Sequence, residues 1–332
     1  MNSLSVCIIA KNEENNISRC LASVEHIAEE IVVVDTGSTD NTIMIAKSFG
    51  AKIVYHEFNN DFAGARNKAL DNATKDWILY LDCDEQLDYE DSYRLKEILD
   101  NDKFEGYCLS LSNIIDGKKN LTLPSLRVFK NRKEYRFVGK IHEQINPAIE
   151  AFSGKDNVDI TDVKFYHYGY DENYADIPAK IKRNLAIFNS YEESEKNGFF
   201  YYNLANENLR INNLEEAIEC YLKANEFEDD NGYKVYIPMY VTKAFHGLGK
   251  YKEAIDHGSK FLMSYPTYKD LYFIMTSCFY ELSMFKEARD CLLKYIQYSK
   301  FDYGYPKFNF ESDNDINALL LDLDNKIKNS SL

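Results

Sequence analysis

The chain has 332 residues, of which 45% are hydrophobic and 28% charged, enough for one large globular domain and a smaller one. A formal net charge of -15 argues against nucleic acid or an anionic membrane surface as a partner. No apolar segment approaches the ~18 residues that cross a bilayer, so no stable membrane insertion is expected.

Cysteine usage and the start of the chain both favour a cytoplasmic protein. The seven cysteines are scattered, odd in number and never form a C-x-x-C pair. They are therefore expected to be reduced and mostly buried thiols. The apolar run at residues 4–10 is too short for the core of a signal peptide.

Apolar runs and helical stretches alternate in the first half of the chain. Strands are expected at residues 4–10, 31–34, 52–55 and 77–81, and helices at residues 12–24, 43–49 and 61–73. This repeated order predicts an α/β domain with a Rossmann-like, doubly wound and mostly parallel sheet. After Gly106 the segments become shorter, which predicts antiparallel additions at 107–112 and 125–130 that carry the acceptor side of the site.

From about Ile177 the chain has little strand signal, and Tyr, Leu and Ala recur at helical spacing. Glu-Ala pairs at residues 216, 253 and 287 lie 37 and then 34 residues apart. This spacing resembles the tetratricopeptide helix-turn-helix repeat, three copies of which stack into an array with a concave binding face. A plain helical bundle is the alternative, and Gly258 stands where such repeats usually carry a bulky residue.

Residues 82–84 read Asp-Cys-Asp and directly follow the apolar run 77–81. Because side chains alternate along a strand, Asp82 and Asp84 are expected to point to the same side. Two carboxylates held that close repel unless a cation lies between them, and hard oxygen ligands suit Mg²⁺ or Mn²⁺. Such a cation commonly bridges to phosphates, so the pattern indicates a diphosphate donor; an ordinary acidic turn is the alternative. The pair lies where open α/β sheets bind ligands, at the carboxyl end of a strand.

Three further positions lie just after predicted strands. Asp35 ends the second strand and is a candidate acceptor of hydrogen bonds from an imide N–H or a ribose hydroxyl, or else a cap of the following helix. Asn12 and Glu13 follow the first strand at the same edge and are candidates to close a nucleotide pocket. Their alternative is a helix N-terminus with favourable acidic charge.

Basic and titratable side chains supply the remaining candidates. Arg66 lies among small residues near a helix start and is a candidate for holding a diphosphate, with an exposed helix arginine as the alternative. Arg127 and the basic residues at 130–140 are mostly expected to be solvated, with one or two reaching phosphates. His142 and Glu143 form the best pair for a general base, with a satisfied surface pair as the alternative. His167 is a candidate third metal ligand or a core histidine.

Seven ordered segments resemble the family 2 glycosyltransferases with a GT-A fold. They are AKNEE (10–14), VVVDTGSTD (32–40), DFAGARN (61–67), DWILYLDCDE (76–85), RVF (127–129), IHE (141–143) and HYGY (167–170). The resemblance covers residues 1–175, with a helical repeat domain at 176–332. This domain order resembles the bacterial peptide S-glycosyltransferases that modify glycocin bacteriocins.

The resemblance implies roles for the matching positions. A UDP-sugar donor would be bound by Ala10, Asn12, Glu13, Asp35, Arg66, Asp82, Cys83 and Asp84. Mn²⁺ or Mg²⁺ would be held by Asp84, Asp82 and His167. Transfer would invert the anomeric carbon in one displacement, with Glu143 or His142 as the base, and Cys83 stands where alanine is common in relatives.

The expected activity is transfer of a hexose to a peptide side chain, with a small ribosomal peptide bound by the repeats. The acceptor atom stays open between a Cys thiol and a Ser or Thr hydroxyl, as does the sugar. The alternatives are the same chemistry on a cell-surface polysaccharide or lipid-linked sugar, and a binding scaffold whose transferase half has decayed. Repeat arrays often pack against each other, so a homodimer is a further open expectation.

Overall fold

The computed structural model describes residues 2–101, 103–115, 117–169, 177–228, 232–301, 303, 305 and 313–329. The chain divides into two compact units, Met1–Ser190 (unit 1) and Tyr191–Leu332 (unit 2). The boundary predicted between residues 175 and 176 lies outside the described residues.

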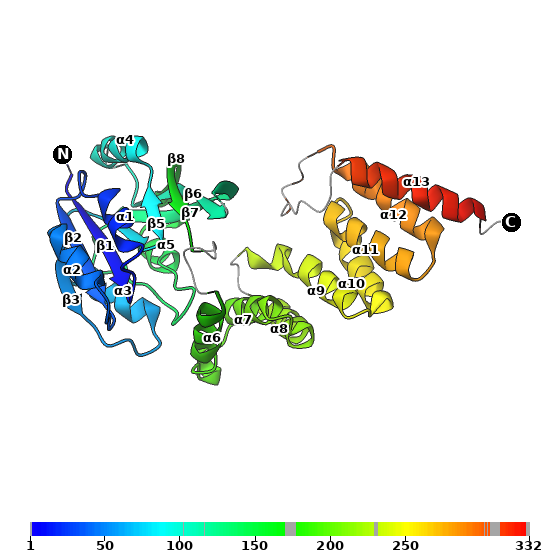
Figure 1. Ribbon diagram of the computed structural model, residues 1–332, viewed down its shortest axis with the longest axis horizontal. Helices are drawn as coiled ribbons and strands as arrows, with labels where there is room; N and C mark the ends of the chain where they lie inside the picture. The colour runs from blue at the N-terminus through cyan, green and yellow to red at the C-terminus, as the bar shows by residue number, and fades with distance from the viewer. Residues whose placement is uncertain are drawn as a thin grey trace. The chain divides into compact units, whose positions relative to one another are not determined.

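Among the described residues, unit 1 is built on one eight-stranded mixed sheet with the order β3-β2-β1-β4-β7-β6-β8-β5 (Figure 1). Its strands are β1 (Leu4–Ala10), β2 (Glu30–Asp35), β3 (Lys52–Tyr55), β4 (Trp77–Asp82), β5 (Glu85–Leu87), β6 (Gly106–Ile115), β7 (Lys118–Lys130) and β8 (Val158–His167). The β3-β2-β1-β4 half is parallel throughout, as the β-α-β pattern predicted.

The second half of the sheet is where the chain reverses direction. β7 runs antiparallel to both β4 and β6, which confirms the predicted antiparallel additions. β6 and β7 are both longer than predicted. β8 pairs parallel with β6, and the short β5 pairs antiparallel with β8. The mixed GT-A-like sheet expected from the sequence is thereby confirmed.

Helices cover the sheet and connect its strands. Those of unit 1 are α1 (Ile17–Ala22), α2 (Thr42–Ser48), α3 (Phe62–Leu70), α4 (Tyr89–Asp100), α5 (Asn146–Ser153) and α6 (Ile177–Phe188). α1 begins later than predicted because Asn12 takes a left-handed φ of 55° and a turn precedes the helix. α3 begins where predicted, since the Asp61 side chain accepts a hydrogen bond from the Gly64 amide at 2.9 Å.

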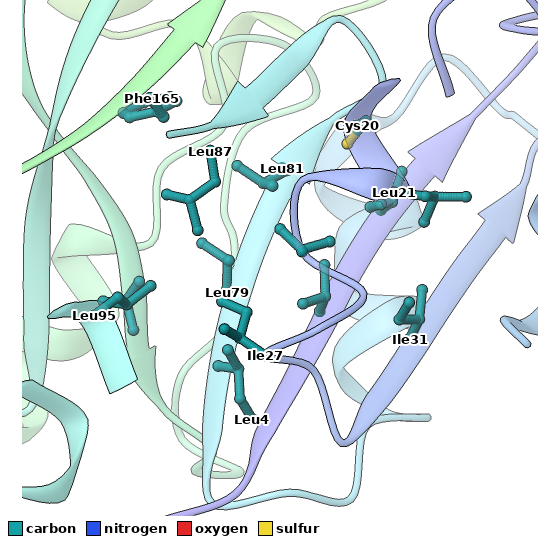
Figure 2. Packing of buried hydrophobic residues seen from close by; sticks show 14 of the residues in the cluster. Leu4, Cys20, Leu21, Ile27, Ile31, Leu79, Leu81, Leu87, Leu95 and Phe165 are labelled. Carbon is teal, nitrogen blue, oxygen red and sulfur yellow. The ribbon is translucent and has the colours of Figure 1, made fainter. Parts of the chain in front are cut away.

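Both faces of the sheet carry an apolar core. Figure 2 shows Leu79 and Leu81 of β4 packed with Leu21 of α1 and the neighbouring Ile27. The opposite face of the sheet carries a second apolar cluster, which includes Ile78 of β4. With both faces covered, apolar side chains fill the strands, and polar groups are left to their ends.

Unit 2 consists of helices paired in sequence order, and α13 packs on the last pair (Figure 1). The helices are α7 (Gly198–Arg210), α8 (Leu214–Glu226), α9 (Ile237–Gly247), α10 (Tyr251–Ser264), α11 (Lys269–Glu281), α12 (Phe285–Tyr298) and α13 (Asp313–Asn329). The recurring Glu-Ala pairs lie in the first turns of α8, α10 and α12. The predicted helical repeats are confirmed.

Two further expectations concern thiols and membranes. All seven cysteines are free, and five are buried, as expected. In the part of the chain that the structure describes, no helix has the length and apolar character needed to span a bilayer.

Candidate active site

Strand register brings the predicted donor-binding positions to one edge of the sheet. Ala10 at the end of β1 is level with Asp35 at the end of β2, and Ile9 is level with Asp82 at the end of β4. Parallel strands end on the same side, so these three carboxyl ends form one edge.

The loops after β1 and β2 are tied together by Asn12. Its side-chain oxygen accepts a hydrogen bond from the Thr39 amide at 2.8 Å, and its own amide donates to the Ser38 hydroxyl at 3.0 Å. Asp35 is only 4% exposed, and one of its oxygens accepts from the Ser38 amide at 3.0 Å. Asp35 therefore stabilises this turn.

Arg66 of α3 is buried rather than exposed, and it joins two predicted site carboxylates. Its Nη2 donates to Asp82 Oδ1 at 2.8 Å, and its Nε donates to Glu143 Oε1. Burial raises the pKa of Asp82, but the Arg66 and Arg127 guanidiniums outweigh burial and hold that pKa below its usual value. Asp82 is therefore ionised and already paired.

The turn after β4 is fixed by a buried ion pair that sequence reasoning missed. Arg127 Nη2 donates to Glu85 Oε1 at 2.6 Å, and Glu85 Oε2 accepts from the Asp82 amide at 2.9 Å. Glu85 is 1% exposed. Arg127 is thus not among the solvated charges; it holds the strand end from which the acidic pair projects.

Four other basic residues of that region have partners in unit 1. Lys130 and Arg132 both pair with Glu105, at 3.2 and 2.6 Å. Arg136 pairs with Asp71 at 3.0 Å, and Lys140 donates to the Ser190 carbonyl at 3.2 Å. These contacts place most of the cluster in roles that stabilise the fold.

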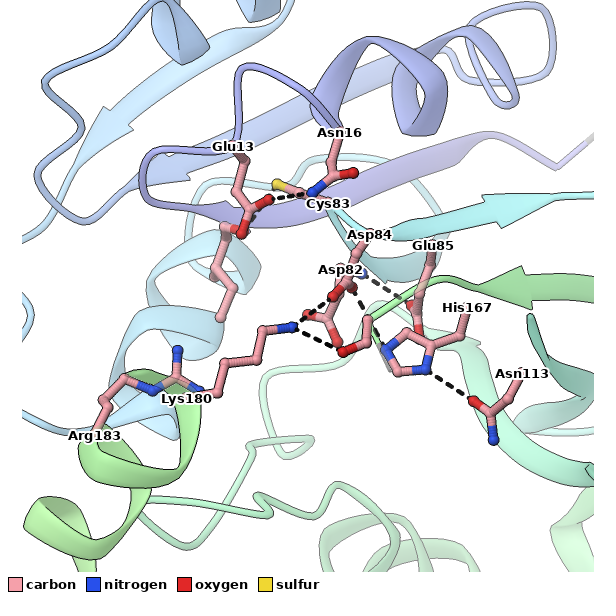
Figure 3. Close-up of polar contacts among 12 residues, drawn as sticks. Glu13, Asn16, Asp82, Cys83, Asp84, Glu85, Asn113, His167, Lys180 and Arg183 are labelled. Carbon is pink, nitrogen blue, oxygen red and sulfur yellow. Dashed lines mark hydrogen bonds and ion pairs between the residues drawn. The ribbon is translucent and has the colours of Figure 1, made fainter. Parts of the chain in front are cut away.

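Asp84 meets His167 and Lys180, as Figure 3 shows. His167 Nε2 lies 3.7 Å from Asp84 Oδ1, and Lys180 Nζ lies 3.0 Å from Asp84 Oδ2. Burial raises the pKa of Asp84, but the neighbouring His167 imidazole and the Lys180 ammonium outweigh burial and hold that pKa far below its usual value. Lys180 belongs to α6, and no pattern in the sequence pointed to it.

The backbone around this contact is closely fitted. A Cβ added to Gly169 would overlap both Asp84 Oδ2 and His167 Nε2. The other ring nitrogen of His167 lies 2.9 Å from Asn113 Oδ1. Asn113 thereby orients the imidazole so that Nε2 is directed at Asp84.

Asp84 and His167 suit a divalent cation. A carboxylate oxygen and an imidazole nitrogen converge, and the second ring nitrogen is oriented by an amide, as is typical of metal-binding histidines. Among the described residues no group of three His, Cys, Asp or Glu side chains forms a complete metal site. Asp84 and His167 by themselves therefore do not fill the coordination shell of such a cation.

The other predicted residues take different positions around this edge. Glu13 accepts from the Asn16 side chain at 2.9 Å, and burial raises its pKa. The Cys83 thiol donates toward the Ile9 carbonyl at 3.4 Å and belongs to the apolar core. His142 has a left-handed φ of 51°, and its ring stacks on Phe188 of α6 at 6.2 Å between centroids.

Residues 5–156 match the model of the family described as glycosyl transferase family 2. The likeness to family 2 glycosyltransferases is therefore a property of this segment. His167, Gly169 and Lys180 lie after the matched segment, although they meet Asp84 within it.

Two curated proteins are similar over larger parts of the chain. A TPR repeat-containing protein of Synechococcus elongatus is 36% identical over 177 residues, which are 52% of this chain and 44% of that protein. The SPbeta prophage-derived glycosyltransferase SunS of Bacillus subtilis is 29% identical over 266 residues, 79% of this chain and 54% of that protein. The chain thus spans about half the length of these relatives.

A solved structure, S. aureus TarS 1-349 in complex with UDP-GlcNAc, is similar over 93% of this chain and over 100% of the TarS chain. Its TM-score is 0.46, and its sequence identity is 15%.

Proposed function

We propose that the protein is a glycosyltransferase that moves a hexose from a UDP-sugar to a peptide side chain, with a cysteine thiol as the preferred acceptor. The observation that carries the proposal is the convergence of Asp84 and His167 at the sheet edge where Asp35, buried and within the segment that matches the family 2 model, also lies.

Residues at the strand ends would bind the donor. Asp35, buried at the end of β2, would accept hydrogen bonds from the uracil or ribose. Asn12 keeps the neighbouring loop closed against residues 38 and 39. The diphosphate would lie toward the end of β4, near Asp84.

Asp84 and His167 would hold Mn²⁺ or Mg²⁺, with Asp82 as the further ligand that the family resemblance implies. When bound, the cation would neutralise the negative charge that develops on the departing UDP. Asp82 is itself held by Arg66, which also bonds Glu143. The guanidinium thus joins the donor side of the site to the proposed base.

Transfer would be one displacement in which the acceptor sulfur bonds to the anomeric carbon as the bond from that carbon to the UDP oxygen breaks. The thiol proton passes to Glu143 or His142, adjacent residues on the loop beside Arg66. A thiol with a free pKa of ~8.5 needs only modest help from such a base. A hydroxyl acceptor would need more.

The helical pairs of unit 2 are proposed to bind the acceptor peptide. They carry stacked tyrosines, including Tyr202 with Tyr233 at 5.0 Å and Tyr221 with Tyr240 at 5.4 Å between ring centroids. Arrays of such pairs present extended binding surfaces, and the domain order is that of the peptide S-glycosyltransferases.

The decisive experiment measures UDP release from a panel of UDP-sugars with Mn²⁺, using the full chain, Asp84→Asn, and Asp290→Asn as an exposed carboxylate control on α12. We expect release by the wild type and Asp290→Asn, and a loss of at least about 100-fold in Asp84→Asn. Mass spectrometry of cysteine and serine peptides then identifies the acceptor. Absence of turnover with every UDP-sugar and acceptor would favour a binding scaffold instead.

A further inference from the structure

We propose that Lys180 is an exchangeable counter-charge for Asp84: its ammonium competes with a divalent cation for the carboxylate and, once displaced, binds the diphosphate of the donor. The inference rests on the proposed function, because it assumes a diphosphate donor at this edge. It assigns a donor-binding role to a residue of α6, outside the segment that matches the family model.

The geometry places the ammonium where a hard cation would be expected. Lys180 Nζ lies 3.0 Å from Asp84 Oδ2 and 3.4 Å from the Gly169 carbonyl oxygen. His167 Nε2 faces the other carboxylate oxygen at 3.7 Å. Lys180 thus engages Asp84 on the side opposite the imidazole, as Figure 3 shows.

Burial and flexibility suit an exchange. The Asp84 side chain is 11% exposed, whereas that of Lys180 is 34% exposed, so the ammonium approaches from the solvent side. A lysine ammonium is a compact charge on a flexible four-carbon stem. Because the lysine side chain is partly exposed, its ammonium can return to water without movement of α6 when another cation takes its place.

Electrostatics makes the two cations competitors. A divalent cation bound to the Asp84 carboxylate would repel an ammonium on the same group, because charges a few ångströms apart interact strongly at a partly buried site. The displaced ammonium would find the diphosphate nearby, since that group would share the metal. A charge-assisted hydrogen bond from Nζ to a phosphate oxygen would replace the one to Asp84.

The neighbouring basic residues of α6 differ from Lys180. Arg183 lies one turn further along, and its guanidinium is placed over the Phe62 ring at 5.0 Å. Lys182 is exposed on the same helix and provides a matched control of charge and position.

Two binding measurements on the full chain test the inference. The first titrates Mn²⁺ alone, with free Mn²⁺ followed by electron paramagnetic resonance. The second titrates UDP by calorimetry at saturating Mn²⁺. We expect Lys180→Met to bind Mn²⁺ about fivefold more tightly and UDP about tenfold more weakly than the wild type. Lys182→Met should match the wild type in both.

Lys180→Arg supplies a further comparison, because a guanidinium pairs with a carboxylate more firmly than an ammonium does. Mn²⁺ should bind this variant more weakly than the wild type. Mn²⁺ binding by Lys180→Met that is equal to or weaker than that of the wild type, in a variant whose circular dichroism is unchanged, would overturn the exchange. Wild-type protein that binds neither Mn²⁺ nor UDP would overturn the proposed function as well, so the two failures are distinguishable.

Discussion

At the scale of single residues, Arg66 organises the candidate site more than any isolated acid does. The sequence left it open between a diphosphate ligand and an exposed helix arginine. In the structure it is 8% exposed and bonds both Asp82 and Glu143. Its charge is therefore used first to hold two carboxylates in place.

Arg66→Met should reduce the free energy of unfolding by about 3 kcal/mol, because Glu143 would keep a largely buried charge without its guanidinium partner. Urea denaturation at pH 7 measures the change. Arg136→Met removes a guanidinium whose ion pair is more exposed and should cost less than about 1 kcal/mol. Equal losses in the two variants would contradict a special role for Arg66.

A second prediction at this scale concerns Glu105 and pH. Hydrogen bonds from Arg132 and Tyr135, together with Lys130, outweigh burial and lower the pKa of Glu105 from 4.5 to about 2. A carboxyl whose pKa is lower in the folded state stabilises the protein when the pH is above the pKa of the unfolded state. This contribution is lost as the pH falls toward the pKa of the folded state. Glu105→Gln should therefore cost about 1 kcal/mol at pH 7.

The difference in unfolding free energy between wild type and Glu105→Gln should be constant above about pH 5 and should shrink as pH falls from 4.5 toward 2. Chemical denaturation at a series of pH values gives this curve. A difference that grew toward acid pH would contradict the ion-pair explanation.

At the scale of elements, the helix pairs of unit 2 explain an apparent defect in the repeats. Gly258 of α10 stood where such repeats usually carry a bulky residue. It is buried, and a Cβ there would lie 2.9 Å from Met275 Sδ on α11 and 3.5 Å from Thr242 Cγ2 on α9. α9 and α11 therefore pack so close to Gly258 that a bulky side chain there would have no room.

Gly258→Ala should change the free energy of unfolding by less than about 1 kcal/mol, because better helix propensity offsets a small shift of the flexible Met275. Gly258→Val should cost about 1 to 3 kcal/mol, because the extra methyl groups overpack the contact. Thermal denaturation of both variants checks the contrast. A valine variant as stable as the alanine variant would show that the helices separate easily.

At the scale of the whole molecule, the described site residues belong to unit 1. The strand ends, Arg66, His167 and Lys180 all precede residue 191. Unit 2 contributes the helical pairs proposed to bind the acceptor.

A protein truncated after Ser190 should keep Mn²⁺-dependent UDP binding within about threefold of the full chain, because unit 1 has its own core and α6. It should lose at least about tenfold in transfer to a peptide, since the repeats are missing. Calorimetry with UDP and mass spectrometry of the peptide measure the two activities. Unchanged peptide transfer would contradict acceptor binding by unit 2.

The helices and strands were predicted from local sequence patterns. The apolar run at residues 77–81 is continuous, and the Glu-Ala pairs at residues 216, 253 and 287 recur 37 and then 34 residues apart, so both patterns can be recognised from the sequence alone. The parallel direction of β1 to β4 also followed from repeated β-α-β connections, which placed Asp35 and Asp82 at one edge. The short β5 was missed because three residues are too few to show a period.

Partners of the site side chains depended on the tertiary structure. Asp84 and Lys180 are 96 residues apart, and Arg127 and Glu85 are 42 residues apart, so no local period connects them. An acidic pair at a strand end can be recognised by its spacing. Which cation neutralises each acid is decided only when the sheet, α3 and α6 have packed, because ion pairs form between charges that folding happens to bring within a few ångströms.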